Sequence, residues 1–210
     1  VGIRTLNSAY AVGGGPLLVS TIESNYRVDI DNYASVDFSS MANIIDLVGG
    51  VDLEVSTQEA GYINMYLDEQ CGLQGLNASD YYVTGGGITH LNGNQAVGFA
   101  RIRYTSRGNE HSDYGRTSRQ REILVQLMQK ARSLDATTLL AVVNNMLPLI
   151  THNIDAATLT NLIANAPSYI NYDIQTDRIP YDGLYSNLGE ELVPDFEATI
   201  NRLHQTIYGN

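Results

Sequence analysis

The stretch SSMANIIDLVGGVDLEV, residues 39–55, sets a helical segment directly before an extended one. Its first part is typical of an α-helix that Ser39 or Ser40 caps and that Gly49–Gly50 ends. In its last part, residues 51–55, valine and leucine alternate with aspartate and glutamate, which predicts a half-exposed strand. A helix followed so closely by a strand indicates an α/β fold built in layers.

The flanking sequence extends this pattern in both directions. A glycine turn with Pro16 near the first helical position precedes one expected helix, and residues 33–38 predict a short strand. Residues 56–90, rich in Tyr, Gly and Asn, are expected to form a loop-rich insertion. Downstream segments that begin at Asp135 and Asp155 predict helices with an aspartate at the N-cap. We therefore predict an α-β-α domain with a central mixed β-sheet flanked by helices.

Composition limits the classes of protein to consider. The 210 residues are 43% apolar, enough for a buried core in a single domain over residues 1–210. The net charge of −11 argues against nucleic acid as a partner, because such proteins need a broad basic face. Cys71 is the single cysteine, so no intramolecular disulfide can form, and we assign it no role.

The positive charge is concentrated in one place. ARIRYTSRGNEHSDYGRTSRQREIL, residues 100–124, contains six of the twelve Lys and Arg residues. In an extended chain, Arg101 and Arg103 would lie on one face, with Ile102 and Tyr104 on the other. A local basic patch on an acidic protein indicates a pocket for a small, highly charged anion.

A long helix is expected after Asp113, ending at about Ser133. At about 100° per residue, its core-facing stripe consists of four apolar residues: Ile123, Leu124, Leu127 and Ala131. Arg116 and Gln120 fall on the same stripe, and Arg119 lies on its flank. Two like charges about 4 Å apart repel by roughly 4 kcal/mol at an effective dielectric of about 20, so inward-facing arginines need an anion or carboxylates beside them.

Arginine binds phosphate oxygens bidentately and keeps its charge, so a di- or triphosphate would fit this cluster. We predict that Arg101, Arg103, Arg116, Arg119 and Gln120 bind it, and that Asp113 serves as a base or as a metal ligand. The alternative from periodicity alone is a solvated basic helix stabilised by i,i+4 ion pairs.

The same residues resemble the LytR-CpsA-Psr (LCP) family of cell-wall glycopolymer transferases. The family pattern of Arg-x-Arg followed by Asp-x-x-Arg-x-x-Arg-Gln occurs as RIR at 101–103 and DYGRTSRQ at 113–120. Further similar pieces follow in order: LNSAYAVGGGPLL at 6–18, DIDNYASVDFSSMANIIDLVGGVDLEV at 29–55 and HLNGNQAVGFARIR at 90–103. The resemblance covers nearly the whole chain.

The resemblance implies a phosphotransferase that moves a glycopolymer from a polyprenyl-pyrophosphate carrier to peptidoglycan. The glycopolymer would be a teichoic acid, a capsular polysaccharide or another wall polysaccharide. Arg101, Arg103, Arg116 and Gln120 match the residues that hold the pyrophosphate, and Asp113 and Arg116 are the expected catalytic residues. Mg²⁺ is the implied cofactor, and an apolar tunnel between sheet and helices would take the lipid tail.

The resemblance also implies an extracytoplasmic protein of a bacterium, typically Gram-positive, attached to the cell membrane by an anchor outside this chain. The family's N-terminal Arg-Asp strand region, with its acidic metal ligands, has no match here, so we expect those ligands upstream and treat the domain as N-terminally incomplete. The alternative function is a protein that binds or senses polyprenyl phosphates without transfer. Transcriptional regulation is the weakest hypothesis, because the acidic chain has no nucleic-acid motif.

Overall fold

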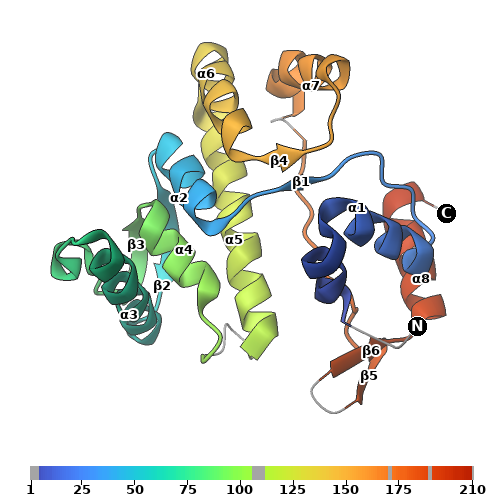
Figure 1. Cartoon of the computed structure of the whole chain (residues 1–210), viewed down its shortest axis with the longest axis horizontal. Coiled ribbons are helices and arrows are strands. Elements are labelled where there is room, and N and C mark those ends of the chain that lie inside the picture. The colour runs from blue at the N-terminus through green and yellow to red at the C-terminus, as the bar shows by residue number, and fades with distance from the viewer. Residues whose placement is uncertain (1–4, 106–111, 170–171, 189–190, 210) are drawn as a thin grey trace. The chain divides into compact units, whose positions relative to one another are not determined.

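The structure is a computed structural model that describes residues 5–105, 112–169, 172–188 and 191–209 (Figure 1). The side chains of residues 74, 112, 113 and 191 lie outside the described part. The chain divides into two compact units. Unit 1 comprises residues 1–35, 152–154 and 175–210, and unit 2 comprises residues 36–151 and 155–174. The single domain over 1–210 stays a prediction.

Unit 2 contains most of the helices and one antiparallel strand pair. Its elements are α2 (Phe38–Leu47), β2 (Val51–Val55), α3 (Thr57–Gln74), the 3₁₀ helix η1 (Ala78–Tyr81), β3 (Gly87–Leu91), α4 (Gly93–Arg101), α5 (Ser112–Ser133), α6 (Ala136–Met146), the 3₁₀ helix η2 (Leu147–Leu149) and α7 (Ala156–Tyr169). The short strand β4 (Thr151–His152) lies at the boundary between the two units in the sequence. Asp135 and Asp155 accept hydrogen bonds at the starts of α6 and α7, as predicted.

The strand pair β2–β3 anchors the core of unit 2. Val51 pairs with Leu91 and Val55 with Gly87 in an antiparallel register. The predicted alternation is confirmed, because Val51, Leu53 and Val55 are buried while the side chains between them are not. Residues of α2, α3, α4 and α5 complete this core, and Figure 1 shows α3 and α4 beside the strand pair.

The predicted α/β class is therefore confirmed, but the strands of the described chain differ from the predicted central mixed sheet. They form two-stranded sheets, and both β2–β3 and the pair of residues 185–188 with residues 191–194 are antiparallel. The reason lies on the second face of β2–β3, where Asp52 and His90 are half-exposed or exposed. A central strand of a layered sheet buries both faces, and charged side chains there oppose such burial.

The prediction of a loop-rich insertion over residues 56–90 is wrong for its first half, because residues 57–74 form α3. Ser56 and Glu59 make a capping box at its start, which satisfies backbone N–H groups that the first turn leaves free. Ala60, Ile63 and Leu67 then recur at helical spacing and are buried against the core. The high content of Tyr, Gly and Asn concealed this apolar stripe.

The cap of α2 also differs from the prediction. Asp37, rather than Ser39 or Ser40, is the N-cap residue, and its Oδ1 accepts a hydrogen bond from the Ser40 backbone N–H at 2.7 Å. Aspartate caps as well as serine does, and its earlier position lets the helix begin at Phe38. The end of α2 before Gly49–Gly50 is as predicted.

Unit 1 contains α1 (Leu6–Tyr26), β1 (Ala34–Ser35), β5 (Tyr185–Leu188), β6 (Glu191–Pro194) and α8 (Phe196–Tyr208). The predicted glycine turn appears as a break inside α1, where Gly13 and Gly14 leave helical geometry just before Pro16. Tyr26, Val28 and Ile200 form the small core of this unit. In the part of the chain that the structure describes, no helix has both the length and the apolar character to cross a membrane.

Candidate functional site

A pocket of about 720 Å³ opens in unit 2 among α2, α3, α4 and α5. It is lined by Phe38 of α2, by Tyr62, Met65, Tyr66 and Glu69 of α3, by Gly98, Ala100 and Arg101 of α4, by Ile102, Arg103 and Tyr104 after α4, and by Arg116 and Gln120 of α5. Four of the predicted pyrophosphate-binding residues, Arg101, Arg103, Arg116 and Gln120, are thus brought together from the end of α4 and from α5.

Arg101 is held by two aromatic rings. It is the last residue of α4, where a cation also interacts favourably with the helix dipole. Its guanidinium carbon lies 4.6 Å from the centre of the Tyr66 ring and 5.1 Å from the centre of the Phe38 ring. Both distances are within the range of a cation–π interaction. The guanidinium is therefore positioned at the pocket wall by contacts that need no ligand.

Arg103, Arg116 and Gln120 add further polar groups to the lining. Arg103 follows α4 and is exposed, whereas Arg116 is half-buried in the first turns of α5. Gln120 lies one turn after Arg116, and its amide donates a long hydrogen bond of 3.5 Å to the Ala100 carbonyl. The prediction that Arg116 and Gln120 share a face is confirmed in this respect, since both line the pocket.

The rest of the lining, apart from Glu69, is aromatic and apolar. The rings of Tyr62 and Tyr104 lie 6.0 Å apart with a tilt of 35°, and the exposed side chains of Met65 and Phe38 contribute further apolar surface. Glu69 contributes a carboxylate to the lining, beside three arginines. A cationic pocket with an aromatic wall suits an anionic group that is attached to an apolar or ring-shaped one.

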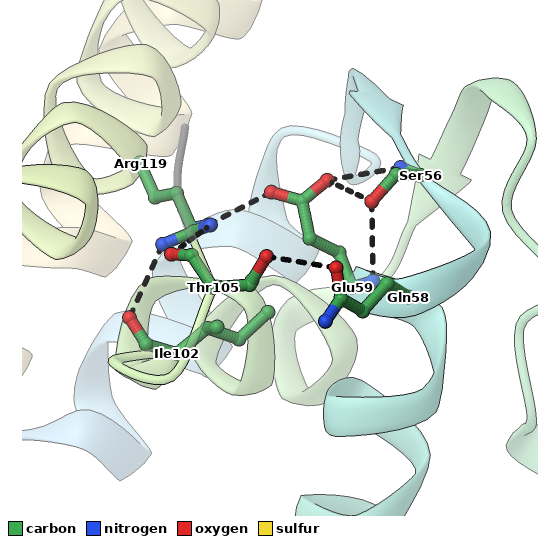
Figure 2. A network of polar contacts seen from close by, with 6 residues as sticks. All are labelled: Ser56, Gln58, Glu59, Ile102, Thr105 and Arg119. Atoms are coloured by element: carbon green, nitrogen blue, oxygen red, sulfur yellow. Dashed lines mark hydrogen bonds and ion pairs between the residues drawn. The ribbon is translucent and has the colours of Figure 1, made fainter. Parts of the chain in front are cut away.

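Arg119 does not line this pocket, which corrects the prediction that it binds the anion. Its side chain is fully buried, with 0% of its surface exposed. Figure 2 shows its guanidinium directed to the carboxylate of Glu59 and to two backbone carbonyls. From the helical periodicity, Arg119 was expected beside the core-facing stripe of α5. In the folded chain, that side of α5 faces α3 rather than the pocket.

Two further predictions concern Asp113 and a metal. Asp113 lies in the first turn of α5, but its side chain is outside the described part, so its catalytic role stays a prediction. Within the described ranges, no group of three or more His, Cys, Asp or Glu side chains is arranged to hold a metal ion. The residues that the structure describes therefore provide a pocket lined by arginines, and no cluster of metal-ligating side chains is found among them.

The sequence did not predict the aromatic residues that α2 and α3 contribute to the pocket, and Tyr104, expected on the face opposite Arg101 and Arg103, lines the pocket with them. Tyr62 and Tyr66 are four residues apart and would share one face of a helix, which is how α3 presents them to the pocket. The four-residue spacing was present in the sequence, but it predicts a shared face only if residues 57–74 are helical, and a loop was predicted there. Nothing in the sequence near Phe38 indicated that its ring meets Arg101.

The fold and the pocket together define an α/β protein with a pocket that sets three arginines beside an aromatic wall. The model of the LytR_cpsA_psr family matches residues 2–203. This chain therefore belongs to the LytR_cpsA_psr family, and the resemblance inferred from its arginine motifs is confirmed.

Relatives of known name are similar over part of their length. The polyisoprenyl-teichoic acid–peptidoglycan teichoic acid transferase TagU of Enterococcus faecalis is 32% identical over 148 residues, which are 67% of this chain and 41% of that protein. The transferase TagV of Bacillus subtilis, of the same descriptive name, is 32% identical over 128 residues, 61% of this chain and 29% of that protein. The chain thus spans less than half of the length of either relative.

A solved structure of TagT from B. subtilis bound to LIIa-WTA has a similar fold. Its TM-score is 0.67 at 17% sequence identity, and the match covers 99% of this chain and 72% of that chain. At this identity, the likeness shows that the fold is shared.

Proposed function

We propose that this protein is a phosphotransferase that moves a glycopolymer from a polyprenyl-pyrophosphate carrier to peptidoglycan. The observation that carries the proposal is the convergence of Arg101, Arg103, Arg116 and Gln120 on one aromatic-walled pocket. The names of the relatives TagU and TagV support it, since both are teichoic acid transferases. We propose a teichoic acid or a capsular polysaccharide as the glycopolymer.

The arginines fit the chemistry of a pyrophosphate. A guanidinium offers paired N–H donors that match two phosphate oxygens and keeps its charge at any physiological pH. In the transfer, the acceptor sugar hydroxyl attacks the phosphorus that carries the glycan, and the bond from this phosphorus to the bridging oxygen breaks. Polyprenyl monophosphate leaves, the hydroxyl loses its proton, and a phosphodiester joins the glycan to its acceptor. Arg101, Arg103 and Arg116 would stabilise the negative charge on the leaving phosphate.

The proposal also assigns roles to Asp113 and to the aromatic wall of the pocket. Asp113 is the proposed base for the hydroxyl proton, with Arg116 as its catalytic partner. The aromatic wall with Phe38 and Met65 would contact the first isoprene units of the carrier, where each buried CH₂ contributes about 0.8 kcal/mol.

Mg²⁺ is proposed on the family relationship alone, and the steps above are assigned to the protein's own side chains. On the same basis we propose that the full protein acts outside the bacterial cytoplasm, attached to the cell membrane, and that its organism is Gram-positive. Peptidoglycan is its proposed acceptor, and nucleic acid has no place in the reaction.

The test is calorimetric titration of farnesyl pyrophosphate into the chain, with and without Mg²⁺. Arg101→Ala and Arg116→Ala are each expected to weaken binding by about 1.5–3 kcal/mol, roughly ten- to a hundredfold, as for loss of a charge-assisted hydrogen bond. Arg132→Ala is the matched control, because Arg132 lies in the last turn of the same helix as Arg116 and does not line the pocket.

A second measurement separates transfer from binding. A lipid-linked glycan incubated with peptidoglycan should release polyprenyl monophosphate if the chain transfers. Tight binding without release would support the alternative, a protein that binds or senses polyprenyl phosphates. Equal affinity in the wild type, Arg101→Ala and Arg116→Ala would refute the pocket as the pyrophosphate site.

A further inference from the structure

An ion pair between α3 and α5 is more deeply buried than any of the arginines that line the pocket. Arg119 and Glu59 expose 0% and 2% of their side chains, and Arg119 Nε donates to Glu59 Oε1 at 2.9 Å. Removing two charges from water costs several kcal/mol each, and such a pair persists only where further hydrogen bonds compensate. Both partners have such bonds.

Glu59 uses its second oxygen to fix the start of α3. Its Oε2 accepts hydrogen bonds from the Ser56 backbone N–H at 2.9 Å and from the Ser56 hydroxyl at 2.8 Å (Figure 2). The hydroxyl oxygen in turn accepts from the Glu59 N–H at 3.2 Å. One carboxylate therefore joins the first turn of α3 to α5.

Arg119 uses its two terminal nitrogens to hold the chain that leaves α4. One NH₂ group donates to the Ile102 carbonyl at 3.2 Å and the other to the Thr105 carbonyl at 3.1 Å. The Thr105 hydroxyl also donates to Gln58 Oε1 at 3.0 Å. Figure 2 shows these contacts on both sides of the turn over residues 102–105. This turn is not part of a helix or strand, and these hydrogen bonds hold it at both of its ends.

The turn carries the pocket residues Arg103 and Tyr104, and it directly follows Arg101. We propose that Glu59 and Arg119 are positioning residues that set the distance between the guanidiniums of Arg101 and Arg103, and so make the pocket selective for two linked phosphates over one. The inference rests on the proposed pyrophosphate site and deepens it. Glu59 and Arg119 do not line the pocket, so they act through the turn and not on the ligand.

The planar fork of arginine is what the position requires. A guanidinium can donate to the Glu59 carboxylate and to two separate carbonyls at fixed angles. A lysine at position 119 keeps the charge and can pair with Glu59, but its single nitrogen does not reproduce the three directions. Misplacement by about 1 Å of a group that must be aligned can cost on the order of a hundredfold in reaction rate, so we expect binding that depends on two aligned guanidiniums to be sensitive to their spacing as well.

The experiment compares the affinities of farnesyl pyrophosphate and farnesyl monophosphate for the wild type, Arg119→Lys and Glu59→Gln. Arg132→Lys serves as the control for the same change on the same helix. We expect the preference for pyrophosphate over monophosphate to fall by about tenfold or more in both variants, because one phosphate needs only one well-placed guanidinium. The control should keep the wild-type preference.

The preference, rather than stability, is the readout, because a merely structural pair would lower the unfolding midpoint and leave the preference unchanged. An unchanged preference in folded Arg119→Lys and Glu59→Gln overturns the inference while the proposed function stands. A wild type that binds neither ligand overturns the proposed function, and the inference with it. If both variants fail to fold, Glu59→Asp keeps the charge but shortens the side chain that reaches Arg119; an unchanged preference there overturns the inference, and a reduced one supports it.

Discussion

Replacing Tyr66 by leucine should weaken pyrophosphate binding without removing any group that touches the phosphates. Tyr66 lies in α3, and its ring centre is 4.6 Å from the guanidinium carbon of Arg101. The ring of Phe38 holds the same guanidinium at 5.1 Å. Without Tyr66, one of two rings that restrict Arg101 is lost, and the arginine samples more rotamers before the ligand binds.

The magnitude follows from the cost of immobilising that side chain. Ordering one rotamer-rich side chain at an interface costs about 0.5–1.5 kcal/mol, and the lost cation–π contact at a partly exposed site is worth about 0.5–1 kcal/mol. Because Phe38 remains, we expect a loss of about 1 kcal/mol, which corresponds to roughly fivefold weaker binding. Leucine keeps an apolar side chain on α3, so the fold should be preserved.

The assay is calorimetric titration of farnesyl pyrophosphate into the wild type, Tyr66→Leu, Tyr66→Phe and Arg101→Ala. Tyr66→Phe keeps the ring and should bind like the wild type, so it separates the ring from the hydroxyl. Tyr66→Leu in the Arg101→Ala background should have no further effect, as a double-mutant cycle requires of two coupled residues. Equal losses in Tyr66→Phe and Tyr66→Leu, or an additive loss in the double variant, would refute the reasoning.

Two further predictions follow from other contacts in unit 2. Gly98→Ala should mimic Tyr66→Leu, because a Cβ at Gly98 would lie 2.9 Å from a ring carbon of Tyr66 and must displace the ring; wild-type affinity for farnesyl pyrophosphate would contradict this. Hydrogen bonds from Lys130 Nζ and then His90 Nδ1 lower the pKa of Asp52. The folded-state pKa lies below the unfolded value of about 3.9, so these contacts stabilise the fold above that value and are lost as pH falls through the lowered pKa. The urea midpoint of Asp52→Asn should therefore be below that of the wild type near pH 7 and equal to it near pH 2, and a pH-independent difference would count against the assignment.

Short-range patterns in the sequence predicted much of unit 2. The alternation over residues 51–55 gave β2 because each second side chain of a strand faces the same side, and this depends on no distant residue. Asp135 and Asp155 predicted the starts of α6 and α7 because a cap bonds to N–H groups two and three residues away. The motif at residues 113–120 placed Arg116 and Gln120 on one helical face, because residues four apart in a helix lie on the same side.

The errors arose where a local pattern was weak or where the partner lies far away in sequence. The apolar stripe of α3 is interrupted by polar and aromatic residues, and composition alone suggested a loop. Asp37 was overlooked as a cap because two serines with equal capping ability follow it. Cross-strand pairing is not encoded locally, so the predicted mixed sheet was more extensive than the strand pairs of the described residues.

The sequence by itself determined the class of fold, the family and the set of arginines, because helical and strand periodicity and an ordered motif are properties of neighbouring residues. Only the tertiary structure decided how these arginines divide. Arg119 lies 60 residues from Glu59 in the chain and is buried with it, while Arg101 meets the rings of Phe38 and Tyr66 at the pocket. All are arginines of one short stretch, and what distinguishes them is whether folding brings a carboxylate, an aromatic ring or an open pocket to each guanidinium.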